Sequence, residues 1–461
     1  MSLKMKERAK NFQHNQVINR KYKNPMSYLG ALTYLKGLEA RGIHPGLENT
    51  QQVLKQIPHF YKDFQVDLQN VCFIQVAGTN GKGSTAYFLA SILQAAGYRV
   101  GLFTSPHLHD IRERISIDKQ WISRKDFSTG LWNIKALAED LLKRGLISEM
   151  PSYFEYTFLL AIYYFTRERV DFAILEVGLG GRWDATSALT PGITAITTIA
   201  RDHTMILGKR LGEIAGEKAG IIKKDVPVVC GCKVGSTAHR VIKKRANQAR
   251  APFFNVIDSK NYLVIEDYNH SYHCSYTTEA DDYTFDVRLN GIHQAFNAAA
   301  AVKVIQVLSH NHKWVNVSKT SIGNGIADTF VPARIETLNN SPQVILDGSH
   351  NVHSITALAH FLKEKKKNCL TLVFGVLADK NYRGMIAMLL PYIHRVILTE
   401  PVSPRALPVE KMLKLFKDKV VLVRKKPREA YRSAREYKDD ILIAGSFYLV
   451  GELRKIILAG G

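Results

Sequence analysis

Apolar and polar positions alternate along most of the chain in a way that predicts an α/β fold. Short apolar runs, typical of buried strands, occur at 71–77, 98–104, 170–177, 193–199 and 226–230. Between them, apolar side chains recur every three or four positions at 84–96, 125–145, 153–169 and 211–222, which predicts helices. Repeated strand–helix units favour a parallel sheet covered by helices on both faces.

The same pattern divides the chain. Residues 26–57 predict two short helices, residues 252–290 predict a small antiparallel insertion, and residues 291–310 predict an alanine-rich helix. An interruption near 328–336 precedes a second series, with strands predicted at 343–347, 370–375, 395–400, 420–423 and 440–444. We therefore expect a parallel-sheet domain at 26–330 and a smaller, Rossmann-like α/β domain at 335–461.

Composition is that of a globular protein, because 46% of the 461 residues are hydrophobic and 23% are charged. The formal net charge of +22 raises nucleic acid as a partner. Residues 1–25 alone hold seven Lys or Arg and one Glu, and no motif of a nucleic-acid-binding fold is present. We expect a disordered basic tail there, and a positive field that suits polyanionic substrates elsewhere.

The chain carries no apolar run long enough for a bilayer and no recognisable secretory signal. Its five cysteines include the pair Cys230 and Cys232, which we interpret as strand residues of a cytoplasmic protein and not as a zinc site.

Residues 76–85 read VAGTNGKGST and lie between a predicted strand and a predicted helix. A glycine-rich turn in that context directs backbone N–H groups, together with the positive end of the helix, toward one point. Lys82 adds a full charge, and the hydroxyl groups of Ser84 and Thr85 can bind Mg²⁺. The spacing differs from the common phosphate-binding loop, because Gly83 separates Lys82 from Ser84. The alternative, an ordinary turn with a surface lysine, is disfavoured by the flanking elements.

Two more polar residues follow predicted strands. Glu176 ends the run 170–177 before a glycine-rich turn, and His203 follows the run 193–199. The carboxyl ends of parallel strands face one crevice, so Glu176 can hold Mg²⁺ beside bound phosphates. Taken alone, however, Glu176 is also consistent with a solvated carboxylate. His203 is likewise consistent with an ordinary loop histidine, since magnesium prefers oxygen.

Lys218 lies in a predicted helix that also carries Gly212, Gly216 and Gly220 at steps of four. Spacing alone makes Lys218 an exposed helix lysine. The glycines share one face of the helix, which predicts close backbone packing there.

Taken together, these segments resemble the folate-acting amide ligases, dihydrofolate synthase and folylpolyglutamate synthase, of the Mur ligase superfamily. The resemblance covers the chain from about residue 26. Its motifs occur in the family's order: GTNGKGS at 78–84, TSPHL at 104–108, Phe154-Glu155, 176–186, Asp202-His203, 217–220, His293-Gln294 with Asn297, 332–336, DGSHN at 347–351 and Gly445-Ser446. It implies a P-loop ATPase domain followed by a smaller ligase domain.

The resemblance also implies roles for the matching residues. ATP would be bound by Thr79, Asn80, Gly81, Lys82, Gly83, Ser84, Asn297, Arg334 and Asp347. Magnesium, expected at two sites, would be bound by Ser84, Ser105, Glu176, His203 and a carbamylated Lys218. The pterin substrate would contact Ser152, Tyr153, Phe154, Glu155, Trp183, Asp184 and Ala185, and L-glutamate would contact Ser446 and His350. The catalytic residues would be Lys82, Lys218, Arg334 and His350.

The implied reaction is ATP-dependent addition of L-glutamate to dihydropteroate, to the γ-carboxylate of a folate, or to both, through an acyl phosphate. We expect a cytoplasmic monomer that acts on these small molecules, without nucleic acid or membrane as a partner. A ligase of cell-wall precursors is the alternative within the superfamily, and Gly83 and residues 176–186 argue against it. A nucleotide-binding module without catalysis is disfavoured by the complete set of charged residues.

Two residues depart from the family pattern. Ala333 replaces the glycine before the linker arginine, and Ser187 replaces an asparagine. Because alanine adopts positive φ angles unfavourably, we expect a local change in the linker backbone.

Overall fold

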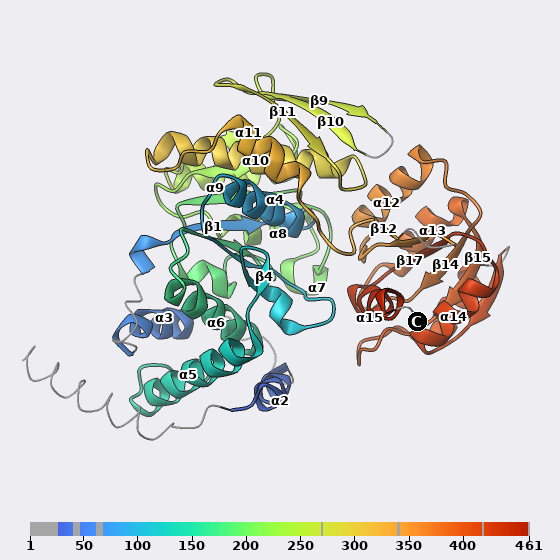
Figure 1. Ribbon diagram of the computed structural model, residues 1–461, viewed down its shortest axis with the longest axis horizontal. Helices are drawn as coiled ribbons and strands as arrows, with labels where there is room; N and C mark the ends of the chain where they lie inside the picture. Colours follow the sequence, from blue (N-terminus) through green and yellow to red (C-terminus); the bar gives the residue numbers. More distant parts are fainter. Residues whose placement is uncertain are drawn as a thin grey trace, which may run out of the picture.

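The computed structural model describes residues 26–39, 47–60, 68–268, 271–338, 342–416 and 419–459. It has a large N-terminal part and a smaller C-terminal part, each built around its own sheet (Figure 1). The predicted tail at 1–25 lies outside the described residues. Among the helices that are described, none is both long and apolar enough to span a bilayer.

The N-terminal part contains an eight-stranded sheet in the order β4-β3-β2-β5-β1-β6-β7-β8. Six strands run parallel, and two short strands extend one edge through antiparallel pairing. The strands are β1 (Cys72–Ala77), β2 (Val100–Phe103), β3 (Ile115–Ile117), β4 (Gln120–Trp121), β5 (Phe172–Glu176), β6 (Ile193–Ile196), β7 (Val228–Cys230) and β8 (Phe253–Asn255).

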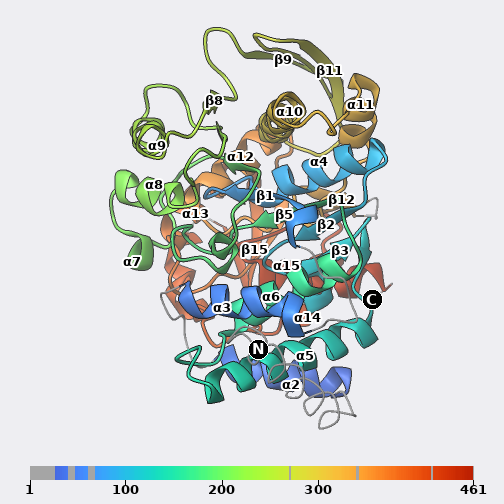
Figure 2. The same cartoon turned by 90° about the vertical axis from the view of Figure 1, so that its left-hand side faces the viewer.

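Helices cover both faces of this sheet, as the alternation of strands and helices predicted (Figure 2). The helices of this part are α2 (Tyr28–Glu39), α3 (Glu48–Phe60), α4 (Lys82–Ala95), α5 (Arg124–Lys143), α6 (Tyr153–Arg167), α7 (Thr204–Leu207), α8 (Leu211–Ala219), α9 (Thr237–Gln248), α10 (His293–Asn311) and α11 (Lys319–Ala327). Alternate residues of β1 serve the two faces. Ile74 and Val76 pack in a core with α4 and α10, whereas Phe73 packs in a core with α5 and α6.

The predicted antiparallel insertion is present as a separate three-stranded sheet in the order β11-β10-β9. Its strands are β9 (Tyr262–Asp267), β10 (Tyr272–Thr277) and β11 (Asp282–Val287). Tyr276 and Phe285 are buried in the core that α4 and α10 share. The small sheet therefore extends the hydrophobic core on the α10 side of the large sheet.

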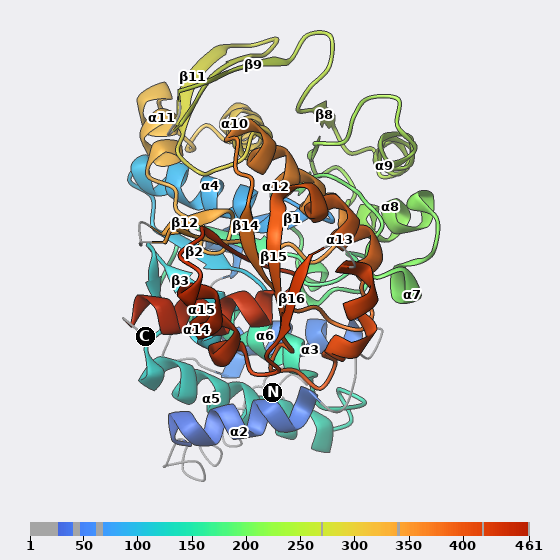
Figure 3. The same cartoon turned by 90° about the vertical axis from the view of Figure 1, so that its right-hand side faces the viewer.

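The C-terminal part is a six-stranded sheet in the order β12-β13-β17-β14-β15-β16 (Figure 3). Only β12 runs antiparallel. The elements are β12 (Glu336–Leu338), β13 (Val344–Leu346), α12 (Val352–Glu364), β14 (Leu370–Phe374), α13 (Tyr382–Leu389), β15 (Ile393–Leu398), β16 (Val420–Val423), α14 (Pro427–Glu436), β17 (Ile441–Ala444) and α15 (Phe447–Leu458). Across the described residues, the 3-10 turns are η1 (Leu68–Asn70), η2 (Ile111–Arg114), η3 (Ala185–Ala188), η4 (Leu390–Tyr392), η5 (Val409–Lys411) and η6 (Leu413–Phe416).

Three local expectations differ from the structure. The large sheet is parallel over six strands as predicted, but the unpredicted strands β3 and β4 add antiparallel pairing at its edge. Cys230 ends β7 as expected, but Cys232 lies in the following loop, where its Sγ is 3.3 Å from the carbonyl oxygen of Thr197. Close packing of the α8 glycines holds only at Gly220, because the space beside Gly216 is open within 4 Å.

Candidate active site

The turn between β1 and α4 has the shape of a phosphate-binding loop. Gly81 caps the helix with a φ of 86°, and the helix begins at Lys82. The Lys82 ammonium group folds back and donates to the carbonyl oxygen of Thr79 at 3.2 Å. Burial lowers the pKa of Lys82, and the nearby carboxylate of Glu176 opposes that effect. The loop thus combines a helix N-terminus with a partly buried cation.

The glycines of this loop are required by close neighbours. A Cβ atom on Gly78 would lie 1.9 Å from Thr197 Oγ1, and one on Gly81 would lie 2.4 Å from Asn297 Oδ1. Asn297 is buried and belongs to α10, which packs beside α4 on the same face of the sheet. The predicted ATP-binding residues of β1, α4 and α10 therefore lie together.

Glu176 ends β5, whose last residues pair with Val76 of β1. Its carboxylate is buried and accepts a hydrogen bond from the backbone N–H of Ser105 at 3.1 Å. A Cβ atom on Gly83 would lie 3.5 Å from both Glu176 oxygens and 3.8 Å from an Arg334 nitrogen. Burial raises the pKa of Glu176, and Lys82 acts in the opposite direction. The loop, this carboxylate and the linker arginine therefore share one space.

The residues beside the loop fit a magnesium ion that is shared with a nucleotide. Ser84 is buried in the first turn of α4, and Glu176 and Ser105 lie at the neighbouring strand ends. Within the described residues, no group of three or more His, Cys, Asp or Glu could hold a metal by itself. Magnesium at nucleotide sites uses one or two protein ligands and takes the remaining ligands from phosphate and water. The donor set is therefore of the kind that needs bound phosphates.

His203 has a different environment from Glu176. Its Nε2 lies 3.5 Å from the Lys380 ammonium nitrogen and 4.0 Å from Asp202 Oδ1. Burial lowers the pKa of His203 to about 4, with Asp202 opposing and Lys380 adding to the effect. The imidazole is therefore neutral at physiological pH and able to bind a metal, but the same nitrogen faces a cation.

Asp202 is the centre of a cluster formed by both parts of the chain. Its carboxylate accepts from Lys380 at 2.7 Å and from Asn351 Nδ2 at 3.0 Å, and it lies 3.4 Å from His350 Nε2. Asn351 also donates to Asn80 Oδ1 of the phosphate loop at 3.1 Å. The C-terminal part is thereby connected directly to the loop.

Lys218 lies in the last turn of α8 and is buried, with 5% of its surface exposed. Burial lowers its pKa to about 7, and the charge of Lys82 adds to the effect. The interpretation of Lys218 as an exposed helix lysine is therefore wrong. At neutral pH a substantial fraction of the amine is unprotonated, which is the form that reacts with carbon dioxide.

The linker places Arg334 between the two parts. Ala333 adopts a φ of 56°, so the expected departure of alanine from the left-handed conformation does not occur. Asp347 accepts from the backbone N–H groups of Ile335 at 2.8 Å and Ser349 at 2.9 Å. Its carboxylate thus fastens the linker beside the arginine.

Known proteins match this arrangement along nearly the whole chain. Residues 76–305 match the Mur ligase middle domain, and residues 333–447 match the Mur ligase glutamate ligase domain. The dihydrofolate synthase/folylpolyglutamate synthase of Bacillus subtilis is 33% identical over 438 residues, which are 93% of this chain and 99% of that protein. The chain belongs to the dihydrofolate synthase/folylpolyglutamate synthase family.

Solved structures of this family agree with the fold. Escherichia coli FolC in complex with DHPP and ADP has a TM-score of 0.81 at 28% identity, covering 95% of this chain and 98% of its own. Mycobacterium tuberculosis folylpolyglutamate synthase complexed with ADP has a TM-score of 0.83 at 28% identity, covering 93% of this chain and 99% of its own. The predicted family, the α/β fold class and the prediction of an ATP-dependent ligase are confirmed.

Three of the residues predicted to contact the pterin stabilise the local structure. Ser152 and Glu155 form a capping box at the start of α6, and Glu155 also accepts from Thr50 at 2.5 Å. Asp184 accepts from the backbone N–H groups of Gly178 and Leu179 at 2.9 and 3.0 Å, which holds the glycine-rich turn. These carboxylates are engaged before any substrate arrives.

The other residues predicted to contact the pterin differ in how accessible they are. Trp183 is 53% exposed and presents an open aromatic surface, whereas Ala185 is buried. Phe154 packs so tightly over Gly178 that a Cβ atom there would lie 2.6 Å from its ring. Tyr153 lies under the guanidinium group of Arg114, 5.3 Å from the ring centre. Trp183 is therefore the side chain best placed to stack on a flat ligand.

At the predicted glutamate positions, Ser446 caps α15 by accepting from the N–H of Tyr448 at 3.2 Å. His350 Nδ1 lies 3.0 Å from the carbonyl oxygen of Gly348, so its other nitrogen faces Asp202. His350 thus joins the cluster between the two parts, whereas Ser446 orders a helix start.

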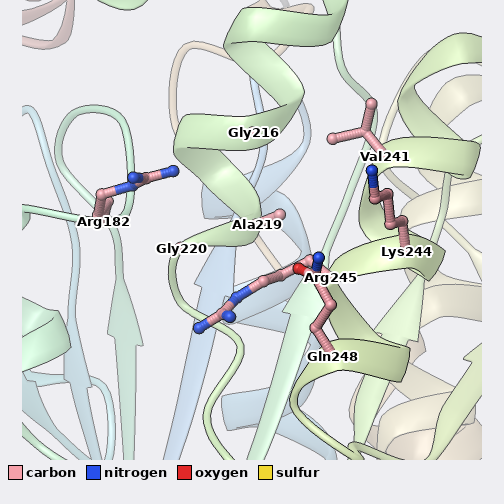
Figure 4. A pocket seen from close by; sticks show the side chains of 8 residues that line it. All are labelled: Arg182, Gly216, Ala219, Gly220, Val241, Lys244, Arg245 and Gln248. Atoms are coloured by element: carbon pink, nitrogen blue, oxygen red, sulfur yellow. The ribbon is translucent and has the colours of Figure 1, made fainter.

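A hollow of about 450 Å³ lies between α8 and α9, where Arg182, Lys244 and Arg245 lie around the end of α8 (Figure 4). Its lining includes Gly216 and Ala219, but not the buried Lys218. The predicted site residues lie elsewhere.

Sequence reasoning missed Lys380, which follows β14 in the C-terminal part. The signal was available, because the pair Asp379-Lys380 comes shortly after a predicted strand, as do the other site residues.

Proposed function

We propose that this enzyme joins L-glutamate to a pterin-linked carboxylate, either that of dihydropteroate or the γ-carboxylate of a folate, through an acyl phosphate. The observation that supports this most is the meeting of the phosphate loop, Glu176 and Arg334 in one space. Two comparisons support the choice of substrates. Residues 333–447 match a glutamate ligase domain, and relatives are named as both dihydrofolate synthase and folylpolyglutamate synthase.

In the first step, an oxygen of the substrate carboxylate attacks the γ-phosphorus of ATP, and ADP leaves. Lys82 and Arg334 flank the loop and would neutralise the charge that spreads over the transferred phosphoryl group. Ser84, Ser105 and Glu176 would hold a magnesium ion, which supplies a further positive charge to the phosphates when bound. Asn297 packs against Gly81 of the loop, and Asp347 holds the linker by accepting from the N–H of Ile335.

In the second step, the neutral amine of L-glutamate attacks the carbonyl carbon of the acyl phosphate. The new C–N bond forms as the C–O bond to phosphate breaks, and the amine loses a proton. The acyl phosphate is sensitive to water, so both steps require a closed site. Lys380 donates to Asp202, and Asn351 donates to Asn80. These two contacts hold the C-terminal part against the phosphate loop.

Lys218 is proposed to act as its carbamate. The neutral amine adds carbon dioxide and releases a proton, which converts a buried neutral group into an anion. A carboxylate at this point can bind a second magnesium ion, and His203 is the other ligand that the family resemblance implies. The lowered pKa of Lys218, about 7, supports this reaction at neutral pH. A cytoplasmic location and a monomeric state complete the proposal.

The site assignment is tested with Lys82→Ala and Glu176→Gln, measured by ADP release that depends on L-glutamate. We expect each variant to lose roughly a hundredfold or more in turnover while it remains folded. Lys303→Met is the matched control, because it removes another buried ammonium group, which contacts Asn261 and Gln306. Turnover near that of the control in either variant would refute the assignment.

A further inference from the structure

The linker that carries Arg334 has an unusual backbone. Ala333 and Ile335, the residues on either side of Arg334, have φ angles of 56° and 48°. Residues other than glycine rarely adopt these left-handed backbone angles, which are least favourable for a β-branched residue such as isoleucine. Both residues are buried. Surrounding groups must therefore fix the linker in this conformation.

Glu336 is one of these groups. Its Oε2 accepts from the N–H of Ala333 at 2.9 Å, which closes the turn around Arg334. Arg454 in turn binds Glu336 with two parallel hydrogen bonds, 2.7 Å from Nε and 2.8 Å from Nη2. The side chains of Glu336 and Arg454 are only 6% and 16% exposed. A two-point pair of this kind fixes orientation as well as distance.

The helix that carries Arg454, α15, also contacts the side chain of Arg334. Phe447 begins α15, and the Arg334 guanidinium carbon lies 4.5 Å from the centre of its ring. Residues 447 and 454 are seven positions apart, so they share one face of the helix. Gly451, on the same face, approaches the N-terminal part so closely that a Cβ atom would lie 2.4 Å from the carbonyl oxygen of Leu108. The same face of α15 thus contacts Arg334 and packs against the N-terminal part, which contains the phosphate loop.

We propose that Glu336, held by Arg454, is a positioning residue for Arg334. The pair keeps the arginine fixed to the C-terminal part in its left-handed turn, and the arginine reaches the phosphates when α15 docks on the N-terminal part. This inference rests on the proposed phosphate role of Arg334. It assigns a function to the backbone conformation at Ala333, because that conformation is what the Glu336 carboxylate stabilises.

The test is a cycle of Glu336→Gln, Ala333→Gly and the double variant in the full-length enzyme. Glutamine has one acceptor oxygen, so it cannot serve Ala333 and both Arg454 nitrogens together. We expect Glu336→Gln to lower kcat/KM for ATP roughly tenfold to a hundredfold. Glycine adopts the left-handed turn without strain, so Ala333→Gly should recover most of that loss in the double variant. Alone, Ala333→Gly should leave the activity close to that of the wild type.

A purely structural role predicts a different outcome. It would lower the melting temperature of Glu336→Gln without changing kcat/KM for ATP, and Ala333→Gly would recover nothing. Asp439→Asn is the matched control, because it weakens another ion pair of the C-terminal part, with Arg395, away from the linker. Equal kcat/KM values for ATP in Glu336→Gln and Asp439→Asn would overturn the inference.

Arg334→Ala separates this inference from the proposed function. If Arg334→Ala keeps full turnover, the phosphate role fails, and the positioning role fails with it. If Arg334→Ala is inactive while Glu336→Gln is fully active, only the positioning role is overturned.

Discussion

The ammonium group of Lys380 donates to the carboxylate of Asp202 across the boundary between the two parts, with 2.7 Å between Nζ and Oδ1. Their side chains are 6% and 8% exposed. Burial acts to raise the pKa of Asp202, but the hydrogen bond with His350 and the charge of Lys380 outweigh it, so the carboxylate stays ionised. The boundary is therefore held by buried charges that depend on one another.

Replacing Lys380 should loosen this boundary. In Lys380→Met the Asp202 carboxylate stays buried without its cation, and we expect a loss of roughly 3–5 kcal/mol in the free energy of unfolding. Urea unfolding of the two proteins measures the loss. Lys319→Met is the control, because Lys319 pairs with Asp281 at the exposed surface and should matter much less. Equal losses in the two variants would contradict the role of Lys380.

The buried amine of Lys218 should make stability depend on pH. Burial lowers its pKa from 10.5 to about 7, so the folded state disfavours the protonated form. That penalty is complete below about pH 7 and fades as the pH rises toward 10.5, where the unfolded amine also becomes neutral. We expect the stability of Lys218→Met relative to the wild type to be greatest below about pH 7 and to decline above it. Melting curves in buffers free of carbon dioxide test this, and a pH-independent difference would refute it.

The carbamate role of Lys218 makes a separate prediction for activity. Lys218→Ala leaves a space where the carbamate would stand, so it should lose most of its glutamate-dependent ADP release. Short-chain carboxylic acids should restore part of the rate, because they return a carboxylate to that space. Acetate and propionate are compared with chloride at equal ionic strength. Near-wild-type activity without any added acid would show that no carbamate is needed.

Neighbouring residues of the glycine-rich turn should respond differently to mutation. Trp183 is 53% exposed, so Trp183→Ala should raise KM for the pterin substrate with little change in melting temperature or in KM for ATP.

Asp184 holds the turn through Gly178 and Leu179, so Asp184→Ala should lower the free energy of unfolding by about 1–3 kcal/mol. Steady-state kinetics and thermal unfolding of both variants are the measurements. If Trp183→Ala lowered the melting temperature and left KM for the pterin substrate unchanged, Trp183 would not be part of the substrate site.

Much of the fold was predictable, because its central strands are buried on both faces and read as apolar runs, as in Phe172–Glu176. The short strands at the edges gave no such signal. Gln120–Trp121 is a two-residue strand with both side chains exposed, and Glu336–Leu338 begins with a charged residue. Such strands are defined by pairing with a neighbour, which a local pattern does not contain.

At the site, the sequence identified residues near strand ends but not their partners. Lys82, Glu176 and Arg334 converge as the motifs implied. The burial of Lys218 and the pairing of Lys380 with Asp202 depend on contacts between distant segments, which spacing does not encode. Ser152 and Glu155 carry the spacing of a capping box, a local signal that would have separated helix capping from substrate binding.

The central claim is that ATP hydrolysis is coupled to formation of an amide with L-glutamate. The most direct measurement incubates the purified enzyme with ATP, magnesium and L-glutamate, and with dihydropteroate or tetrahydrofolate in parallel, and follows ADP together with product mass. We predict one ADP for each glutamate residue added to at least one of the two acceptors. ADP release without any gain of glutamate, or no turnover with either acceptor, would contradict the account.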